Sequence, residues 1–66
     1  MEKMVQLIAL DSDTLVPLYN VDGDGNPTFD TPLLPMSKAL AYQKEAYAYQ
    51  DRFDTGWRNE FVIEGA

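Results

Sequence analysis

The chain contains no cysteine and no histidine. Without cysteine no disulfide can form, and without either residue the sulfur and nitrogen ligands that transition metals prefer are missing. The absence of histidine also removes the usual general base of nucleophilic catalysis, so neither Ser12 nor Ser37 has a residue that could activate it. We therefore expect a protein that is not an enzyme and carries no cofactor. Its stability must come from packing, a hard cation or association with another chain.

Basic residues are scarce: five Lys and Arg stand against eleven Asp and Glu, for a net charge of −6. Such an acidic chain is a poor ligand for phosphates, so we expect no direct binding to nucleic acid. Long apolar runs are absent too, because nothing approaches the ~20 residues that cross a bilayer. The apolar run near the N-terminus lacks the small-residue cleavage site of a signal peptide. Together with the lack of cysteine, this predicts a cytoplasmic protein that does not contact membranes.

Hydrophobic residues make up 45% of the 66 residues, which suits a single small globular domain over residues 1–66. The first expected strand is apolar on both faces, which predicts a central position in a sheet. Pro17 cannot donate a ladder hydrogen bond, so it predicts an edge or a bulge in the second strand. The turn-forming residues 22–26 predict a hairpin that brings Tyr19 near Phe29. The segments expected to form strands are 4–10, 15–21, 27–30 and 59–64.

Residues 37–53 show the three- and four-residue spacing of an amphipathic helix. Ser37 is the expected N-cap, and Gly56 is expected to stop the helix in a left-handed conformation. The stripe that should face the sheet consists of Ala39, Tyr42, Ala46, Tyr49 and Phe53. The residues expected on the opposite face are Lys44, Ala48, Asp51 and Arg52.

The order of elements predicts an α+β fold, with a three- to four-stranded, mainly antiparallel sheet and one amphipathic helix packed on one face. In the last strand, alternation predicts Phe61 and Ile63 inward and Glu60 and Glu64 outward. Because the first strand is apolar on both faces, the sheet face away from the helix needs cover. A homodimer is the simplest source of that cover.

The acidic loop 22–30 is the motif closest to a metal site, because its oxygen-bearing side chains alternate as they do in calcium loops. The residues that would bind the cation are Asp22, Asp24 and Asn26. The match fails at Pro27, where such loops need glycine, and at Leu33, where they need a bidentate Glu. A hairpin turn explains the same residues, so we expect no metal site and keep weak calcium binding as an alternative.

Three side chains around the end of the helix are candidate contact residues. Tyr47 lies away from the centre of the apolar stripe, and Trp57 and Arg58 follow the helix. Tyr, Trp and Arg are the residue types that contribute most to protein interfaces, although a small domain also exposes aromatic rings that it cannot cover. Tyr47, Trp57 and Arg58 are therefore the predicted partner-binding residues.

Three stretches of the sequence carry a resemblance to a known class of proteins: VPLYNVDGDGNPTFD at 16–30, the proline-bounded helix SKALAYQKEAYAY, and the closing WRNEFVIE. In layout they resemble the small acidic accessory proteins of bacteriophages and prophages, especially those of Gram-positive hosts. The resemblance implies a cytoplasmic setting and a role in modulating a host protein. It carries over no functional residue.

The sequence thus predicts a small acidic, non-enzymatic protein-interaction module. The leading alternative is an acidic mimic of DNA that inhibits a nucleic-acid-binding protein. An ordered array of charges would favour mimicry, whereas charges confined to loops would favour the plain module. A weak calcium-binding domain is the third reading. The carboxylates that mimicry would use are Asp11, Asp13, Asp22, Asp24 and Asp30.

Overall fold

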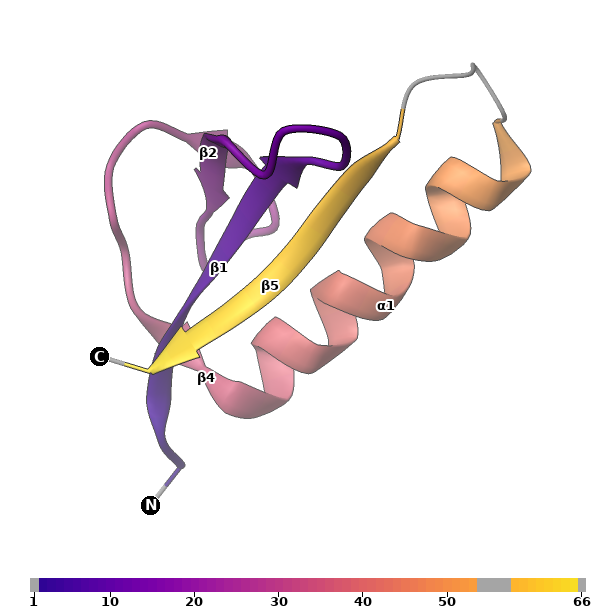
Figure 1. Ribbon diagram of the computed structural model, residues 1–66. Helices are drawn as coiled ribbons and strands as arrows, with labels where there is room; N and C mark the ends of the chain where they lie inside the picture. The colour runs from indigo at the N-terminus through magenta and orange to yellow at the C-terminus, as the bar shows by residue number, and fades with distance from the viewer. Residues whose placement is uncertain (1, 54–57, 66) are drawn as a thin grey trace.

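The computed structural model describes residues 2–53 and 58–65 (Figure 1). One helix packs against a curled antiparallel sheet, which confirms the α+β prediction. In the described residues the sheet has five strands rather than three or four, and two of them are only two residues long. The elements are β1 (Met4–Asp11), β2 (Pro17–Val21), β3 (Pro27–Thr28), β4 (Leu34–Pro35), α1 (Met36–Arg52) and β5 (Asn59–Gly65).

Strand β1 is the centre of the sheet, as its apolar sequence predicts. Leu7 pairs with Val21 of β2 on one edge and with Ile63 of β5 on the other. Val5 likewise pairs with Leu34 of β4 and with the end of β5. Strand β5 therefore occupies one edge of β1, while β4 and β2 follow one another along the opposite edge.

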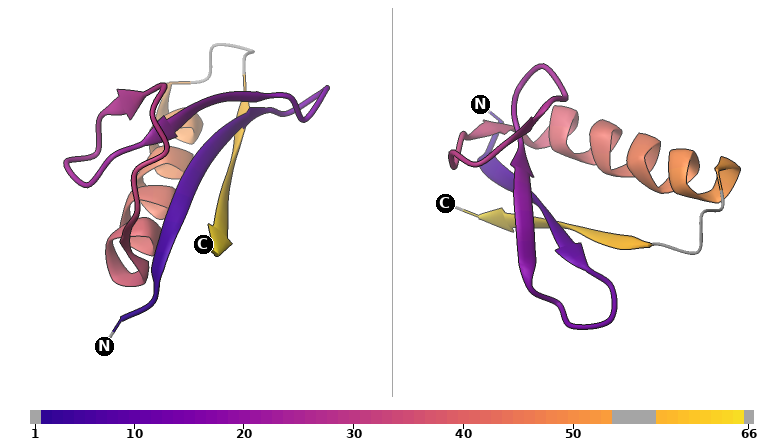
Figure 2. Two further views of the ribbon diagram at one scale, coloured as in Figure 1. Left: turned by 90° about the vertical axis from the view of Figure 1, so that its left-hand side faces the viewer. Right: turned by 90° about the horizontal axis from the view of Figure 1, so that it is seen from above.

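The bulge predicted at Pro17 is present. Ala9 pairs with Tyr19 but Leu10 pairs with Pro17, so Leu18 is an extra residue in β2. A bulge bends its strand and increases the local twist. In Figure 2 β2 diverges from the direction of β5 where the sheet curls. Within the described residues the backbone of α1 runs close to β1, β4 and β5, whereas β2 reaches the shared core through the side chain of Val21.

Strand β3 is shorter than expected, because it ends at Thr28 instead of Asp30. The amide of Asp30 donates to the Thr28 hydroxyl at 3.1 Å, and this local turn diverts the chain from the sheet. Phe29 is 93% exposed, so the expected packing of Phe29 near Tyr19 is wrong.

Helix α1 begins at Met36, and the expected N-cap Ser37 lies inside it. Pro35 occupies the cap position and provides no side-chain hydrogen bond. The acceptors come instead from the segment before β1: the carbonyl of Lys3 accepts from the Met36 amide at 2.9 Å, and the Glu2 carboxylate accepts from the Ser37 amide at 3.1 Å. Pairing of β4 with the start of β1 brings this segment to the helix. The expected stop at Gly56 lies outside the described residues.

The core lies between one face of the sheet and the first half of the helix. Its buried side chains are Val5, Leu7, Ala9, Val21, Leu34, Ala39 and Phe61. Ile63 packs against this cluster, so the predicted inward face of β5 is confirmed, and Glu60 and Glu64 are exposed as predicted. The expected polar face of the helix, with Lys44 and Ala48, is exposed too.

The predicted stripe of the helix is correct in its first half and wrong in its second. Ala39 is buried, and Tyr42 and Ala46 pack against the core. Tyr49 and Phe53, however, are 65% and 50% exposed. The reason is that the second half of α1 packs beside β5 rather than across the sheet, which turns Tyr47 toward the core instead.

The opposite face of the sheet is covered by none of the described elements. Ile8 and Leu10 lie there and are half-buried, with Ile8 paired to Val62 of β5. The sequence predicts that a second copy of the chain covers this face. We keep the homodimer as a proposal, which analytical ultracentrifugation tests by measuring the mass in solution.

Candidate functional site

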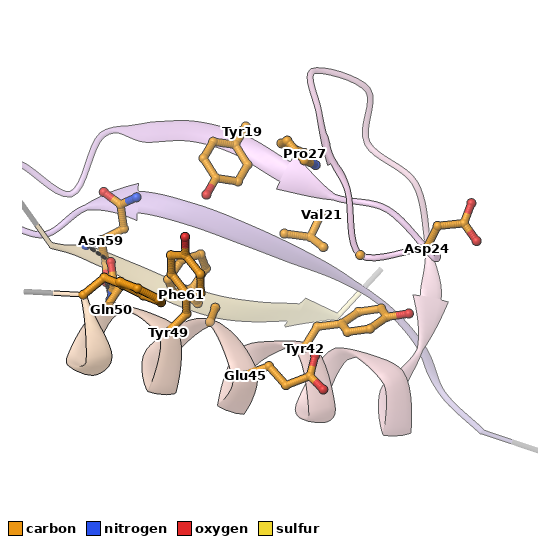
Figure 3. A pocket seen from close by; sticks show the side chains of 13 residues that line it. Tyr19, Val21, Asp24, Pro27, Tyr42, Glu45, Tyr49, Gln50, Asn59 and Phe61 are labelled. Atoms are coloured by element: carbon orange, nitrogen blue, oxygen red, sulfur yellow. Dashed lines mark hydrogen bonds between the residues drawn. The ribbon is translucent and has the colours of Figure 1, made fainter.

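A groove of about 810 Å³ opens between α1 and the hairpin of β2 and β3 (Figure 3). It lies where the bulged strand bends away from the helix. Five aromatic side chains contribute to its walls, from β2, from α1 and from β5. They are Tyr19, Tyr42, Tyr49, Phe53 and Phe61.

One end of the groove is closed by contact between the helix and the hairpin loop. The hydroxyl of Tyr42 donates to the carbonyl of Gly23 at 3.0 Å. Gly25 lies against the ring of Tyr42 and has a φ of +85°, a conformation that favours glycine. The loop is therefore held on the helix at this end of the groove, and the Lys38 ammonium donates to the same carbonyl at 3.4 Å.

The other end carries an exposed aromatic pair. The rings of Tyr49 and Phe53, one helical turn apart, have centroids 4.6 Å apart and planes inclined at 41°. Each ring packs on the other while much of both surfaces stays in water. Large exposed apolar side chains that gather at a concave surface are typical of binding sites.

The wall formed by α1 and β5 is held together by polar side chains of the helix. Gln50 forms two hydrogen bonds with the backbone of Asn59, donating to its carbonyl at 3.1 Å and accepting from its amide at 2.6 Å. The Tyr47 hydroxyl accepts from the amide of Phe61 at 2.9 Å, and Gln43 donates to the Phe61 carbonyl at 2.7 Å. These bonds fix the helix beside β5 and leave its aromatic pair facing the groove.

Tyr47, one of the predicted partner-binding residues, instead joins the helix to β5. Its ring meets that of Phe61 edge-on, with centroids 5.4 Å apart, and its hydroxyl donates to Glu60 at 2.9 Å. Burial raises the pKa of Tyr47; the amide of Phe61 opposes this shift and the Glu60 carboxylate adds to it. The hydroxyl is thus engaged within the protein, and Tyr47 does not line the groove.

Of the other two predicted contact residues, Arg58 also lies away from the groove. The guanidinium of Arg58 forms an ion pair with Asp51 at 2.7 Å on the exposed side of the helix end. Trp57 lies outside the described residues. The structure instead brings forward Tyr49 and Phe53, which the helical spacing assigned to the core. No local signal distinguishes the two outcomes, because they depend on which strand the helix packs against.

The acidic side chains in the turns serve as backbone acceptors. One oxygen of Asp11 accepts from the amides of Asp13 and Thr14, and these bonds lower the pKa of Asp11. One oxygen of Asp22 accepts from the amides of Asp24 and Asn26, both at 2.9 Å. Such bonds are typical of turns. Residues 2–53 and 58–65 contain no group of three or more Asp and Glu side chains that could hold a metal ion.

The charged groups that line the groove are both acidic. Asp24 lies on the hairpin loop, and Glu45 lies on the helix between Tyr42 and Tyr49 (Figure 3). Asn59 lies at the end of the groove, and its Oδ1 is buried without a hydrogen-bond partner in the described structure. The groove therefore combines aromatic walls with two acidic side chains at its border.

No helix in the described part of the chain is long and apolar enough to cross a bilayer. Comparison of the chain with protein-family models, with curated proteins and with solved structures found no match. The groove itself is therefore the basis for a functional assignment.

Proposed function

We propose that the protein is a small non-enzymatic interaction module that binds a partner protein in the groove between α1 and the β2–β3 hairpin. The observation that carries the proposal is the exposed ring pair of Tyr49 and Phe53 at the rim of the groove. Aromatic rings gain free energy when a partner removes them from water, at about 25 cal/mol per Å² of apolar surface.

The lining supports binding rather than bond-making chemistry. Asp24 and Glu45 come from different elements, and the other polar side chains of the described lining are amides and tyrosine hydroxyls. Gln50 and Tyr42 are already hydrogen-bonded to the backbone. The likeness in layout to phage accessory proteins is the ground for proposing that the partner is a host protein.

The positions of the acidic groups favour this module over a mimic of DNA. Asp11 and Asp22 each use a carboxylate oxygen to accept hydrogen bonds from backbone amides of their own turns. Asp13, Asp24 and Asp30 are exposed in loops, and loop charges suit a plain module rather than an ordered array.

The test is photo-crosslinking in a lysate of the source organism with three forms of the full chain. Tyr49→Ser combined with Phe53→Ser removes the ring pair, whereas Leu40→Ser changes an equally exposed apolar residue of α1 that does not line the groove. We expect the wild type and Leu40→Ser to crosslink the same protein and the double variant to lose it. Equal capture by all three folded forms would show that the groove is not the contact surface.

A further inference from the structure

We infer that the groove receives a basic, amphipathic peptide segment, in which lysine or arginine side chains stand next to aliphatic or aromatic ones. This inference rests on the proposed function and names the chemistry of the partner at the same site. It follows from the charge of the lining, from the state of its carboxylates and from the arrangement of its rings.

The first observation is that the charge in the groove is of one sign. Asp24 of the hairpin loop and Glu45 of the helix border it on two sides, with the Asp24 carboxylate turned outward from the loop (Figure 3), and the described lining contains no Lys or Arg. Lys38, which reaches the hairpin loop, donates to the carbonyl of Gly23 at 3.4 Å and does not line the groove. With a net charge of −6 on the chain, the field in this cleft attracts cations.

The second observation is that these two carboxylates are free. Glu2, Asp11, Asp22, Asp51 and Glu60 each accept a hydrogen bond or form an ion pair. Among the described residues, the side chains of Asp24 and Glu45 do neither. A cationic side chain that enters the groove would meet acceptors that no other group of the described chain occupies, and charge-assisted hydrogen bonds are the stronger class.

The third observation is the order of side chains along the helix. Glu45 lies three residues after Tyr42 and four before Tyr49, so all three project from one face (Figure 3). A lysine or arginine can lay its methylene stem on these rings while its charged end reaches Glu45. A cation near a tyrosine ring also gains from the ring quadrupole. Beyond them, Phe53 and Phe61 offer apolar surface to the neighbouring side chains of the peptide.

Other occupants fit this chemistry less well. Nucleic acid would bring phosphates against two carboxylates. A second copy of this chain would bring another net charge of −6 toward the groove. A neutral apolar peptide would leave Asp24 and Glu45 without partners.

The experiment is an NMR titration of the full ¹⁵N-labelled chain with a short synthetic peptide that alternates Lys and Arg with Leu and Trp. One analogue carries Glu in place of every basic residue, and a second carries Ser in place of every apolar one. We expect the basic amphipathic peptide to shift the resonances of Gly25, Gln50 and Asn59 but not those of Ile8 and Val62 on the open sheet face. Both analogues should bind at least about fivefold more weakly, because each lacks one of the two kinds of contact.

Matched variants show whether weaker binding comes from loss of a carboxylate or from a change in the fold. Asp24→Asn and Glu45→Gln should each weaken binding of the basic peptide by about two- to fivefold, the range expected for partly exposed ion pairs, and added salt should weaken binding to the wild type. Glu64→Gln, an exposed acid of β5 outside the groove, should leave the affinity unchanged.

Three results would overturn the inference. Equal binding of the basic and acidic peptides would show that the groove selects for apolar surface alone, which leaves the interaction module standing. Shifts confined to the turns around Asp11 would place any cation preference elsewhere. Absence of shifts with every peptide would reject the inference that the groove binds a basic segment. The crosslinking experiment with the Tyr49 and Phe53 variants would still test separately whether the groove binds a protein.

Discussion

The carboxylate of Glu2 accepts a hydrogen bond from the backbone amide of Ser37 at 3.1 Å, although 35 positions separate the two residues. The helix is thus capped by a residue that is distant in the sequence rather than by a residue next to its own first turn. An anionic acceptor at a helix N-terminus also interacts favourably with the helix dipole.

Replacing Glu2 should therefore weaken the start of the helix. We expect Glu2→Ala to lower the free energy of unfolding by about 0.5–1 kcal/mol, with Glu2→Gln in between because it retains an acceptor. Urea denaturation measures the change, and hydrogen exchange at the Ser37 amide locates it. Glu64→Ala is the control, since Glu64 is an exposed acid of β5 that takes no part in the cap. An equal loss in both variants would mean that the cap contributes nothing.

Tyr47 should make stability depend on alkaline pH. Burial raises the pKa of Tyr47, so the folded state prefers the neutral phenol. Its contribution is complete below about pH 10, the pKa in the unfolded chain, and is lost as the pH rises through the higher folded value. Thermal melts across this range should show less alkaline loss in Tyr47→Phe than in the wild type.

The same substitution should destabilise the protein at neutral pH. Tyr47→Phe leaves the Phe61 amide and the Glu60 carboxylate without the hydroxyl they contact. We expect a cost of about 1–2 kcal/mol, or several degrees in Tm for a domain of this size. Tyr49→Phe is the matched control, because Tyr49 is mostly exposed. A Tyr47→Phe variant as stable as this control would contradict the assigned role.

Ala39 should tolerate no enlargement, because it is fully buried where α1 meets the sheet. Ala39→Leu should cost about 1–3 kcal/mol through overpacking. Ala48→Leu, on the exposed side of the same helix, should stay within about 0.5 kcal/mol of the wild type. Comparison of the two melting temperatures tests the orientation of the helix, and the reverse order would show that it is wrong.

The loop after β2 should respond to mutation but not to calcium. Asp22→Ala removes the acceptor of two backbone amides, so we expect a lower Tm, whereas Asp24→Ala should have little effect. Millimolar calcium should leave the Tm of the wild type unchanged, because a ligand stabilises only when its concentration exceeds its Kd. An upward shift of several degrees that Asp22→Asn abolishes would instead establish a calcium site.

Features that depend on local chemistry could be read from the sequence. The alternation of Phe61 and Ile63 reports directly on which face of a strand is buried. The bulge beside Pro17 follows from its missing amide hydrogen. Asp22 closes its turn through atoms at most four residues away.

Features that depend on distant pairing could not be read in this way. Glu2 caps the helix only because β4 pairs with the start of β1. The orientation of the helix about its axis decides that Tyr47 packs against the core while Tyr49 stays exposed. The contact of the helix with β5 sets that orientation. The groove has the same origin, since it lies between the helix and the hairpin of β2 and β3, which are distant in the sequence.

The hydrogen bonds from α1 to β5 have a consequence for self-assembly. Among the described strands, β5 pairs with β1 alone, and the outward backbone groups of Asn59 and Phe61 are occupied by Gln50, Tyr47 and Gln43. An unprotected strand at this position would be a template for the strands of other molecules, the first step toward fibrils. Because the helix supplies these bonds from side chains, another strand cannot pair with β5 at Asn59 and Phe61 unless the helix detaches. An acidic protein with no disulfide thus gains protection against aggregation from two glutamines and a tyrosine.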